Sequence, residues 1–431
     1  MEAEKIELQG PTNKALHEAA EKILIENDLG GYSVPNRDVY PFQWNWDSAF
    51  VALGYAQFNL DRAWQELETL FKGQWDDGFL PQIIFWKDNA GYFPGPEIWQ
   101  TNQQPRTSGI SQPPVVATIL RQLWEQNQNA EAEEKVKQLI PQVFALHRWF
   151  ASFRDPLKKG LVVTTHPWET GRDNAPEWDE AAKRVDTSNV TPYVRQDTKH
   201  LDKKMRPHKE DYDRFIAMVE FGRDAGWDHK KIIEESPFRV ADVGMTMMLL
   251  RANRDLLVLA EQFGFEGEAE FLKNQISLSE TGVDYLWNEE KQAFCSRDVI
   301  SGESTGIISS ASFLNFYADV GSAEQRAATE AHIDRIAKVS QFLMPSLAPG
   351  EEQFDAMRYW RGPIWAVVNY MIATGCAEQG LEKWADKIRN DTAALIKIAG
   401  FSEAFNPESG EGTGGTDFSW TAAMWLHWAG K

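Results

Sequence analysis

Apolar residues recur at spacings of three and four along most of the chain, and this spacing is typical of amphipathic α-helices. The pattern extends over residues 15–27, 115–126, 133–153, 241–263, 268–287, 323–339, 364–375 and 381–400. Strand patterns are confined to residues 160–165 and to a hairpin expected around residues 291–302. We therefore expect an all-α chain, in which Pro141 kinks or splits one helix.

The predicted helices come in pairs, and the longer connections between pairs carry most of the polar and aromatic residues. Repeated helical hairpins with such connections favour a closed ring of hairpins, with the connecting loops gathered on one face around a pocket. No linker rich in proline, glycine or serine divides the chain. We therefore expect residues 1–431 to form a single domain.

Charge and cysteine content exclude several classes of function. The chain has 64 acidic and 44 basic residues and a formal net charge of −20, which repels phosphate backbones and anionic membranes. Cys295 and Cys376 lack the spacing of a disulfide framework or a cysteine metal site, and the acidic N-terminal segment lacks the features of a secretory signal. We expect a cytoplasmic protein that binds neither nucleic acid nor membrane. The sequence does not distinguish a monomer from a homo-oligomer.

The stretch "PWETGRDNAPEW" places an acidic residue, Asp173, between Trp168 and Trp178. Glycine and proline interrupt this stretch, so it is expected to be a loop. Burial among indole rings would raise the pKa of the Asp173 carboxyl toward the neutral range that a general acid needs. Glu169 and Asp179 are alternative acids in the same loop.

Glu403 in "FSEAFNPESGEG" is the second candidate carboxylate, with the role of activating a water on the opposite face of a sugar ring. Carboxyl groups about 6.5–9.5 Å apart support single displacement with inversion, whereas about 5 Å supports retention. The glycine-rich stretch 410–415 lacks the lysine and the preceding strand of a phosphate loop, so we interpret it as a flexible loop. The eight histidines have no metal-binding spacing, and no metal or other cofactor is expected.

Other aromatic residues stand beside charged ones in loops that contain glycine or proline. These clusters are Trp44 and Trp46 beside Asp47, Tyr359 and Trp360 beside Arg361, and Trp365. An indole or phenol ring offers a flat apolar face to the C–H side of a sugar, and the charged groups suit its hydroxyls. Trp149, Trp287 and Trp384 lack such neighbours and are interpreted as packing residues.

These elements resemble glycoside hydrolase family 63. "ETGRDNAPEW" is similar to the general-acid element of that family and is related to that of the trehalases, while "SEAFNPESGEG" followed by "FSWTAA" is similar to its general-base element. "WNWDSAF" and "YWRGPIW" resemble further family elements in the right order, so the resemblance spans nearly the whole chain. The compact chain, without an N-terminal β-domain, is similar to the bacterial subgroup that hydrolyses mannosylglycerate and glucosylglycerate.

The resemblance implies an (α/α)6 barrel and an inverting α-glycosidase, with Asp173 as general acid and Glu403 as general base. It implies sugar contacts at Tyr40, Trp44, Trp46, Asp47, Gln112 and Trp365, and the "YWRGPIW" element adds Arg361 and Gly362 as binding candidates. "RPHKEDY" resembles a mobile lid segment that brings Arg206 and Tyr212 to the glycerate end of the substrate, which Tyr359 and Trp360 would border. We expect this segment and the loop over residues 86–106 to close over the substrate.

One position departs from the family pattern. A neutral side chain such as Gln is expected before "FSWTAA", but this chain has Asp417. If Asp417 points into the pocket it would repel a carboxylate, so the aglycone stays open between glycerate and a neutral group such as glycerol. Glucose and mannose are not distinguished.

Two other functions stay open at this point. A sugar epimerase or isomerase on the same barrel would need histidines as proton shuttles, and His166 and His208 lie in relevant loops. A non-catalytic sugar-binding protein would bind its ligand without turnover.

Overall fold

The structure is a computed structural model that describes residues 11–89 and 91–431. Among these residues, six helices form a closed inner ring in which each packs against the next and the last packs against the first. In order around the ring they are α2 (Asn45–Tyr55), α5 (Val116–Gln126), α11 (Val243–Phe263), α13 (Leu314–Ala318), α15 (Ala366–Glu378) and α17 (Ser419–Met424). This is the predicted (α/α)6 barrel.

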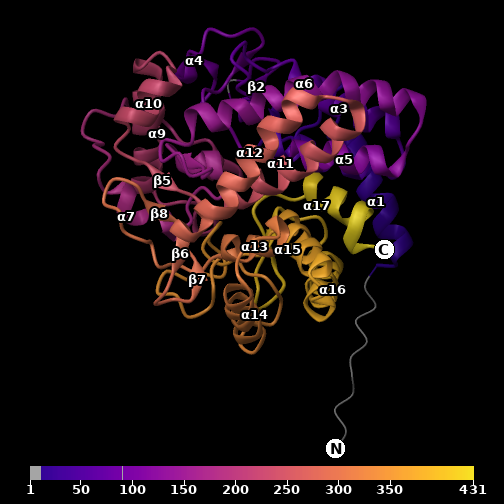
Figure 1. The fold of residues 1–431 in the computed structure, drawn as a ribbon. Helices are drawn as coiled ribbons and strands as arrows, with labels where there is room; N and C mark the ends of the chain where they lie inside the picture. Colours follow the sequence, from indigo (N-terminus) through magenta and orange to yellow (C-terminus); the bar gives the residue numbers. More distant parts are fainter. Residues whose placement is uncertain (1–10, 90) are drawn as a thin grey trace, which may run out of the picture.

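A second set of helices covers the ring from outside. It consists of α1 (Asn13–Glu26), α3 (Leu60–Phe71), α6 (Ala130–Phe153), α12 (Glu266–Gly282), α14 (Ala323–Ala337) and α16 (Glu382–Ala399). Helices α3, α6, α12 and α16 pack against the inner helix that precedes each of them, and α1 packs against α17. The last inner helix therefore lies beside the first outer helix, which closes the barrel (Figure 1).

The inner helices are more completely buried than the amphipathic outer ones. Every residue of α2 is buried, whereas α3 exposes a polar face. Close approach explains two glycines: a Cβ at Gly54 of α2 would lie 2.7 Å from Ala423 of α17, and a Cβ at Gly375 of α15 would overlap the backbone at Tyr317. These glycines allow neighbouring inner helices to touch along their backbones.

The eight predicted helices are present, but two details differ. Helix α6 runs unbroken through Pro141, so the expected kink or split is wrong. Pro141 is exposed, and so is Lys137, whose carbonyl loses its helical partner there. Some helices begin in segments expected to be loops: α2 inside "YPFQWNWDSAF", α9 (Lys209–Asp224) inside "RPHKEDYDR", and α17 inside "FSEAFNPESGEGTGGTDFSW".

The strands are short and lie in the connections between helices. The predicted strand is β4 (Val163–Thr164), which pairs antiparallel with β5 (Val240–Ala241), and β5 pairs with β8 (Arg297–Asp298). The hairpin expected around residues 291–302 lies earlier in the chain, where β6 (Trp287–Asn288) pairs with β7 (Ala293–Phe294). The remaining pairs join β1 (Gln43–Trp44), β2 (Ile83–Phe85) and β3 (Arg106–Thr107), and β9 (Ala404–Phe405) with β10 (Gly412–Thr413). They tie the long connections to one another.

Short helices occupy the remaining connections. They are α4 (Pro96–Trp99), α7 (Asp179–Ala182), α8 (Asp197–His200) and α10 (His229–Glu235).

In the part of the chain that the structure describes, no helix combines the length and apolar character needed to cross a bilayer. The expectation about a secretory signal rests partly on residues 1–10, which lie outside the described residues.

Candidate active site

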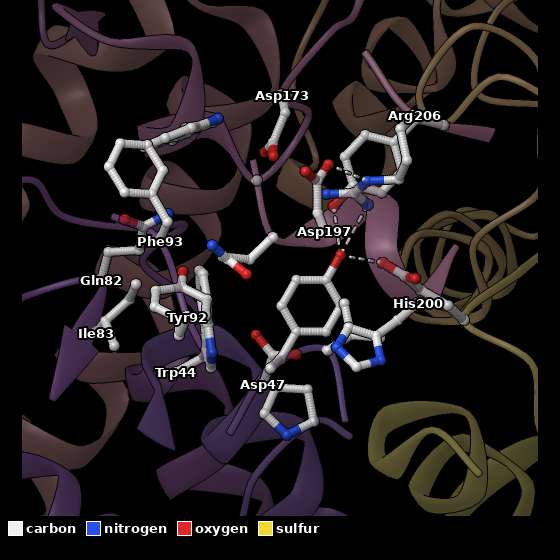
Figure 2. Close-up of a pocket in the computed structure, with 18 of the residues that line it drawn as sticks. Trp44, Asp47, Gln82, Ile83, Tyr92, Phe93, Asp173, Asp197, His200 and Arg206 are labelled. Carbon is white, nitrogen blue, oxygen red and sulfur yellow. Dashed lines mark hydrogen bonds and ion pairs between the residues drawn. The ribbon is translucent and has the colours of Figure 1, made fainter. Parts of the chain in front are cut away.

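The connections between helices enclose a cavity with an empty volume of about 910 Å³, open solvent at its mouth included. Its walls come from the segments around β1 and β2, the loop before α7, the segment between α8 and α9, and the loops that follow α14 and α16. Figure 2 shows Asp47, Asp173 and Arg206 directed toward this space from different segments. The cavity is large enough for a small ligand of two linked units.

Ten of the predicted site residues line this one cavity. They are Tyr40, Trp44, Trp46, Asp47, Gln112, Asp173, Arg206, Tyr212, Tyr359 and Glu403. The fold therefore brings together Asp173 and Glu403, which are far apart in the sequence, within walls that also hold Trp168 and Trp420.

The loop that carries Asp173 is fixed by a tight turn. A 3-10 turn over Pro167–Thr170 ends at Gly171, whose φ of +66° is in the left-handed region that favours glycine. A Cβ at Gly171 would also lie 2.6 Å from Cζ2 of Trp46. The glycine thus lets the loop pass against the indole and turn Asp173 into the cavity.

The residue before Asp173 anchors the same loop to the barrel. Arg172 is buried and forms ion pairs with Glu177 at 2.5 Å and with Asp242 at 2.6 Å. Asp242 in turn caps α11 through a hydrogen bond to the backbone N–H of Met245. Removing one member of such a cluster leaves an unpaired buried charge, so the loop is strongly held in place.

The environment of Asp173 favours its protonated form. Burial raises the pKa of this carboxyl to about 7, the nearby charge of Arg206 opposes the rise, and the charge of Glu403 adds to it. Among the residues that the structure describes, no other residue donates a hydrogen bond to the Asp173 carboxyl. The carboxyl therefore keeps part of its protonated form near neutral pH, and its proton is free to point toward a ligand.

Glu403 is held on both carboxyl oxygens. It is only 1% exposed, Oε1 accepts a hydrogen bond of 2.9 Å from the Tyr40 hydroxyl, and Oε2 accepts one of 2.9 Å from the backbone N–H of Gly415. Burial raises the pKa of Glu403, while the charge of Arg206 and these two hydrogen bonds lower it. The carboxylate is thus oriented without being tied up in an ion pair.

The glycine-rich stretch 410–415 has a defined structure, and the interpretation as a flexible loop needs correction. Its residues Gly412–Thr413 form β10, which pairs with β9 directly after Glu403. Gly414 has a φ of +76°, and a Cβ at this position would overlap the Glu403 carboxylate. The glycines therefore let the backbone close over Glu403 and donate to it.

A third carboxyl group and one cation complete the charged part of the cavity. Burial raises the pKa of Asp47 well above its usual value, and the charges of Glu403 and Asp173 add to the rise. Arg206 is the only lysine or arginine among the described residues that line the cavity. Its Nε donates to Asp197 at 3.0 Å, and its guanidinium carbon lies 4.2 Å from the centre of the Tyr359 ring.

Trp360 and Trp365, two of the five predicted binding residues outside the cavity wall, stack on each other. Their ring centres are 3.9 Å apart with an interplanar angle of 1°. Both indoles are at least 98% buried, because they pack behind Trp46 and Trp420. They are better described as the layer that supports the wall of the cavity than as ligand contacts.

Arg361, Gly362 and Asp417 also lie outside the cavity wall. Arg361 forms a bidentate ion pair with Asp179 at 2.6 and 3.0 Å, and the backbone N–H of Gly362 donates to Ser346. Asp417 is exposed and touches the rest of the barrel through its backbone carbonyl, which accepts a hydrogen bond from Asn27. Asp417 is not among the residues that line the cavity, so the condition under which it would repel a carboxylate ligand is not met.

The alternative acids and histidines are occupied elsewhere. Glu169 forms an ion pair with Arg154 at 2.5 Å, and Asp179 is paired with Arg361. Both ring nitrogens of His166 are hydrogen-bonded to backbone, at 2.9 and 3.0 Å. His208 is exposed at the N-terminus of α9. None of these four groups lines the cavity.

Several wall residues were missed from the sequence. They are Gln82, Tyr92, Phe93, Asp197 and His200. Tyr92 and Phe93 lie in "NAGYFPGPEIW", where aromatic residues stand beside glycine and proline, so the rule that found Trp44 could have found them. Asp197 carries no such signal. Within residues 11–89 and 91–431, no three His, Cys, Asp or Glu residues are grouped so as to hold a metal ion.

A ring of helical hairpins that gathers buried carboxyl groups among aromatic side chains is an (α/α)6 barrel whose cavity suits the hydrolysis of a glycoside. Comparison with known proteins agrees. The family model described as "Mannosylglycerate hydrolase MGH1-like glycoside hydrolase domain" matches residues 40–421. The chain therefore belongs to the MGH1-like glycoside hydrolases of family 63.

Characterised relatives align over nearly the whole chain. Mannosylglycerate hydrolase MGH1 of Selaginella moellendorffii is 43% identical over 416 residues, which cover 96% of this chain and 85% of the relative. Mannosylglycerate hydrolase of Thermus thermophilus is 41% identical, with 95% and 99% covered. Glucosylglycerate hydrolase of Mycolicibacterium hassiacum is 30% identical, with 95% and 96% covered.

Solved structures show the same fold. The family 63 mannosylglycerate hydrolase of Thermus thermophilus in complex with Tris and D-glycerate has a TM-score of 0.93 at 41% identity, and the comparison covers 96% of this chain and 99% of that one. The same enzyme in complex with glucose has a TM-score of 0.89 with the same coverage.

Proposed function

We propose that this chain hydrolyses an α-glycoside of glycerate, mannosylglycerate or glucosylglycerate, by single displacement with inversion. Asp173 is the general acid and Glu403 is the general base. The observation that carries the proposal is the contrast between two carboxyl groups in one cavity. Asp173 has a raised pKa and a carboxyl to which no other described residue donates, whereas Glu403 is oriented by donors on both oxygens.

In the reaction, Asp173 donates its proton to the glycosidic oxygen as the bond from that oxygen to the anomeric carbon breaks. The electron pair of that bond stays on the leaving alcohol. A water attacks the anomeric carbon from the opposite face, and Glu403 takes a proton from this water. The product hexose carries the inverted, β configuration. No cofactor takes part in these steps.

The remaining wall residues suit the two ends of the substrate. Trp44, Trp46, Asp47 and Gln112 line the cavity together and offer indole faces and polar groups to the sugar. Arg206 and Tyr212 are assigned to the glycerate end, because a guanidinium pairs well with a carboxylate. Since Asp417 is exposed, no acidic side chain from its loop opposes an anionic aglycone.

The relatives support the same substrate class. Their names specify mannosylglycerate or glucosylglycerate, and one related structure holds D-glycerate. The choice of hexose is left to experiment. The two histidines named for the epimerase alternative do not support it, because the His166 ring nitrogens are both bonded to backbone and His208 lies outside the cavity, which leaves His200 as the histidine in the described wall.

We also propose that the protein works in the cytoplasm. Cys295 and Cys376 are buried free thiols, which a reducing compartment preserves. Fractionation of cells that express the untagged chain tests this location, and recovery from an extracellular or periplasmic fraction would contradict it.

The experiment that tests the function is a substrate panel with matched variants. Hexose release is measured from mannosylglycerate, glucosylglycerate, glucosylglycerol and trehalose. We expect Asp173→Asn and Glu403→Gln each to lower turnover of the preferred glycoside by ~10²–10⁴-fold. Asp186→Asn and Glu408→Gln make the same changes at exposed positions and are expected to keep full activity. Near-normal turnover by either cavity variant would refute the assignment.

A further inference from the structure

We propose that Tyr40 is a positioning residue that connects the general base to the segment that carries Arg206. This inference rests on the proposed function, because it takes Glu403 as the base. It goes further in giving Tyr40, so far treated as a sugar contact, a second task. Tyr40 fixes the direction of one Glu403 oxygen and transmits to it whether the Arg206 segment is in place.

The Tyr40 hydroxyl has three polar neighbours. It lies 2.9 Å from Oε1 of Glu403, 2.9 Å from Nη1 of Arg206 and 3.1 Å from the Tyr359 hydroxyl. Figure 2 shows bonds of this network as dashed lines beside Arg206. The three neighbours come from different segments of the chain, so the hydroxyl is where those segments meet.

The chemistry of the partners fixes the direction of each hydrogen bond. Arg206 has only donors, and an ionised Glu403 has only acceptors. The single proton of the Tyr40 hydroxyl therefore points to Glu403, and its two lone pairs accept from Arg206 and from Tyr359. A donated bond from Arg206 polarises the phenol and strengthens its own donation to the carboxylate. The hydrogen bond from Tyr40 favours the ionised form of Glu403, which is the form that a base needs, and it acts against the burial that raises the pKa of Glu403.

The Tyr40 ring is held independently of any ligand. Trp44 and Phe418 contact it edge to face, at centre distances of 5.5 and 5.8 Å. The backbone N–H of Tyr40 donates to the carbonyl of Asn36. Because Gly415 already holds the other carboxylate oxygen, loss of the Tyr40 hydroxyl would leave Glu403 anchored on one side only.

The Arg206 end of the link depends on its own segment. Arg206 donates to Asp197 of α8, and its backbone carbonyl accepts a hydrogen bond of 3.1 Å from Arg358. Both contacts place the guanidinium beside Tyr40. If the segment moved away, the Tyr40 hydroxyl would lose the hydrogen bond from Arg206. Its own hydrogen bond to Glu403 would weaken, and the pKa of Glu403 would rise. The base is thus fully prepared only when the segment covers the cavity.

Other charged groups also influence the pKa of Glu403, so a test of the Tyr40 hydrogen bond must leave those groups unchanged. Asp47, Asp173, Arg206 and Tyr359 each interact electrostatically with it. The Tyr40→Phe substitution removes one oxygen atom and leaves all four in place. Its effect on the pH dependence therefore reports the hydrogen bond.

The first experiment is the pH profile of kcat/KM for Tyr40→Phe. The acid limb, which reports ionisation of the base, is expected to move to higher pH by about 0.5–1, while the basic limb stays in place. Tyr92→Phe is the matched control, since Tyr92 lines the same cavity without a bond to Glu403, and its acid limb should not move. An unmoved acid limb in Tyr40→Phe would overturn the proposal.

A second measurement covers the case in which Tyr40→Phe does not fold. Replacement of Tyr40 by 3,5-difluorotyrosine makes the phenol a stronger donor, so the acid limb should move to lower pH. A limb that stays or moves upward contradicts the positioning role. If Glu403→Gln retains activity, the proposed function itself has failed. If Glu403→Gln is inactive and neither Tyr40 variant moves the limb, only the present inference has failed.

The link to the segment is tested by a double-mutant comparison. Arg206→Met should move the acid limb further in the parent enzyme than in the Tyr40→Phe background, because part of its effect passes through the phenol. Equal shifts in the two backgrounds would show that Arg206 acts on Glu403 through space alone and would overturn the link.

Discussion

The backbone N–H of Gly415 donates a hydrogen bond of 2.9 Å to Oε2 of Glu403, and the backbone N–H of Glu403 donates one of 2.7 Å to the carbonyl of Gly415. The hairpin of β9 and β10 thus holds both the main chain and the side chain of the proposed base. Gly414, with a φ of +76°, lets the backbone pass directly over the carboxylate.

This arrangement predicts that Gly414→Ala lowers kcat/KM by ~10²-fold or more, because a Cβ there would displace the Glu403 carboxylate. Gly410→Ala is the matched control in the same hairpin. Its φ is also +76°, but its Cβ would lie 3.1 Å from the flexible side chain of Ile398. Both variants carry similar backbone strain, so equal losses of activity would contradict the role of Gly414.

The raised pKa of Asp173, about 7, sets the basic side of the pH profile. An acid must be protonated to donate, so kcat/KM should fall as the pH rises through this value. The measurement is initial hydrolysis rate at low substrate concentration from pH 5 to 9. A rate that keeps rising above pH 7 would exclude Asp173 as the proton donor.

The same shift predicts a stability effect. Because the pKa of Asp173 is higher in the folded state than in the unfolded state, the folded state binds the extra proton between about pH 4 and 7, and ionisation destabilises the fold as the pH rises through that window. Asp173→Asn should therefore raise Tm by ~2 °C or more at pH 8 and change it little at pH 4. A lower Tm for this variant at pH 8 would contradict the environment described for Asp173.

Arg206 is predicted to select an anionic aglycone, because it is the only arginine or lysine among the described wall residues. Arg206→Met should lower kcat/KM for the glycerate glycoside by ~10²-fold relative to its effect on the neutral glucosylglycerol. The ratio of the two substrates removes any effect on the shared chemical step. An unchanged ratio would place the glycerate carboxylate elsewhere.

Sequence patterns predicted five of the six outer helices, with α3 missed, and three of the six inner helices, α5, α11 and α15. Amphipathic spacing identifies helices such as α6 and α16, because one face of each meets water. Helix α2 is buried all round, so its sequence has no polar face, and its aromatic residues beside Asp47 favour a loop over a helix. Pro141 was expected to break α6, but its exposed position lets water satisfy the carbonyl that loses its partner.

For the site, the local sequence identified Asp173 and Glu403 as residues of the cavity. It could not distinguish the aromatic residues that line the cavity from those that pack behind its wall. Trp44 and Trp365 have similar neighbours in the sequence, yet Trp44 lines the cavity while Trp365 stacks behind it on Trp360. Arg361 likewise has the right character but is engaged by Asp179. Such assignments depend on partners far away in the chain, which neither periodicity nor spacing records.

The most direct test of the account is the configuration of the first hexose released, followed by proton NMR immediately after the enzyme is added to mannosylglycerate or glucosylglycerate. With Asp173 and Glu403 acting on opposite faces of the sugar, the β-anomer should appear first and the α-anomer only later by mutarotation. Initial release of the α-anomer would mean retention and would contradict the proposed roles of the two carboxyl groups.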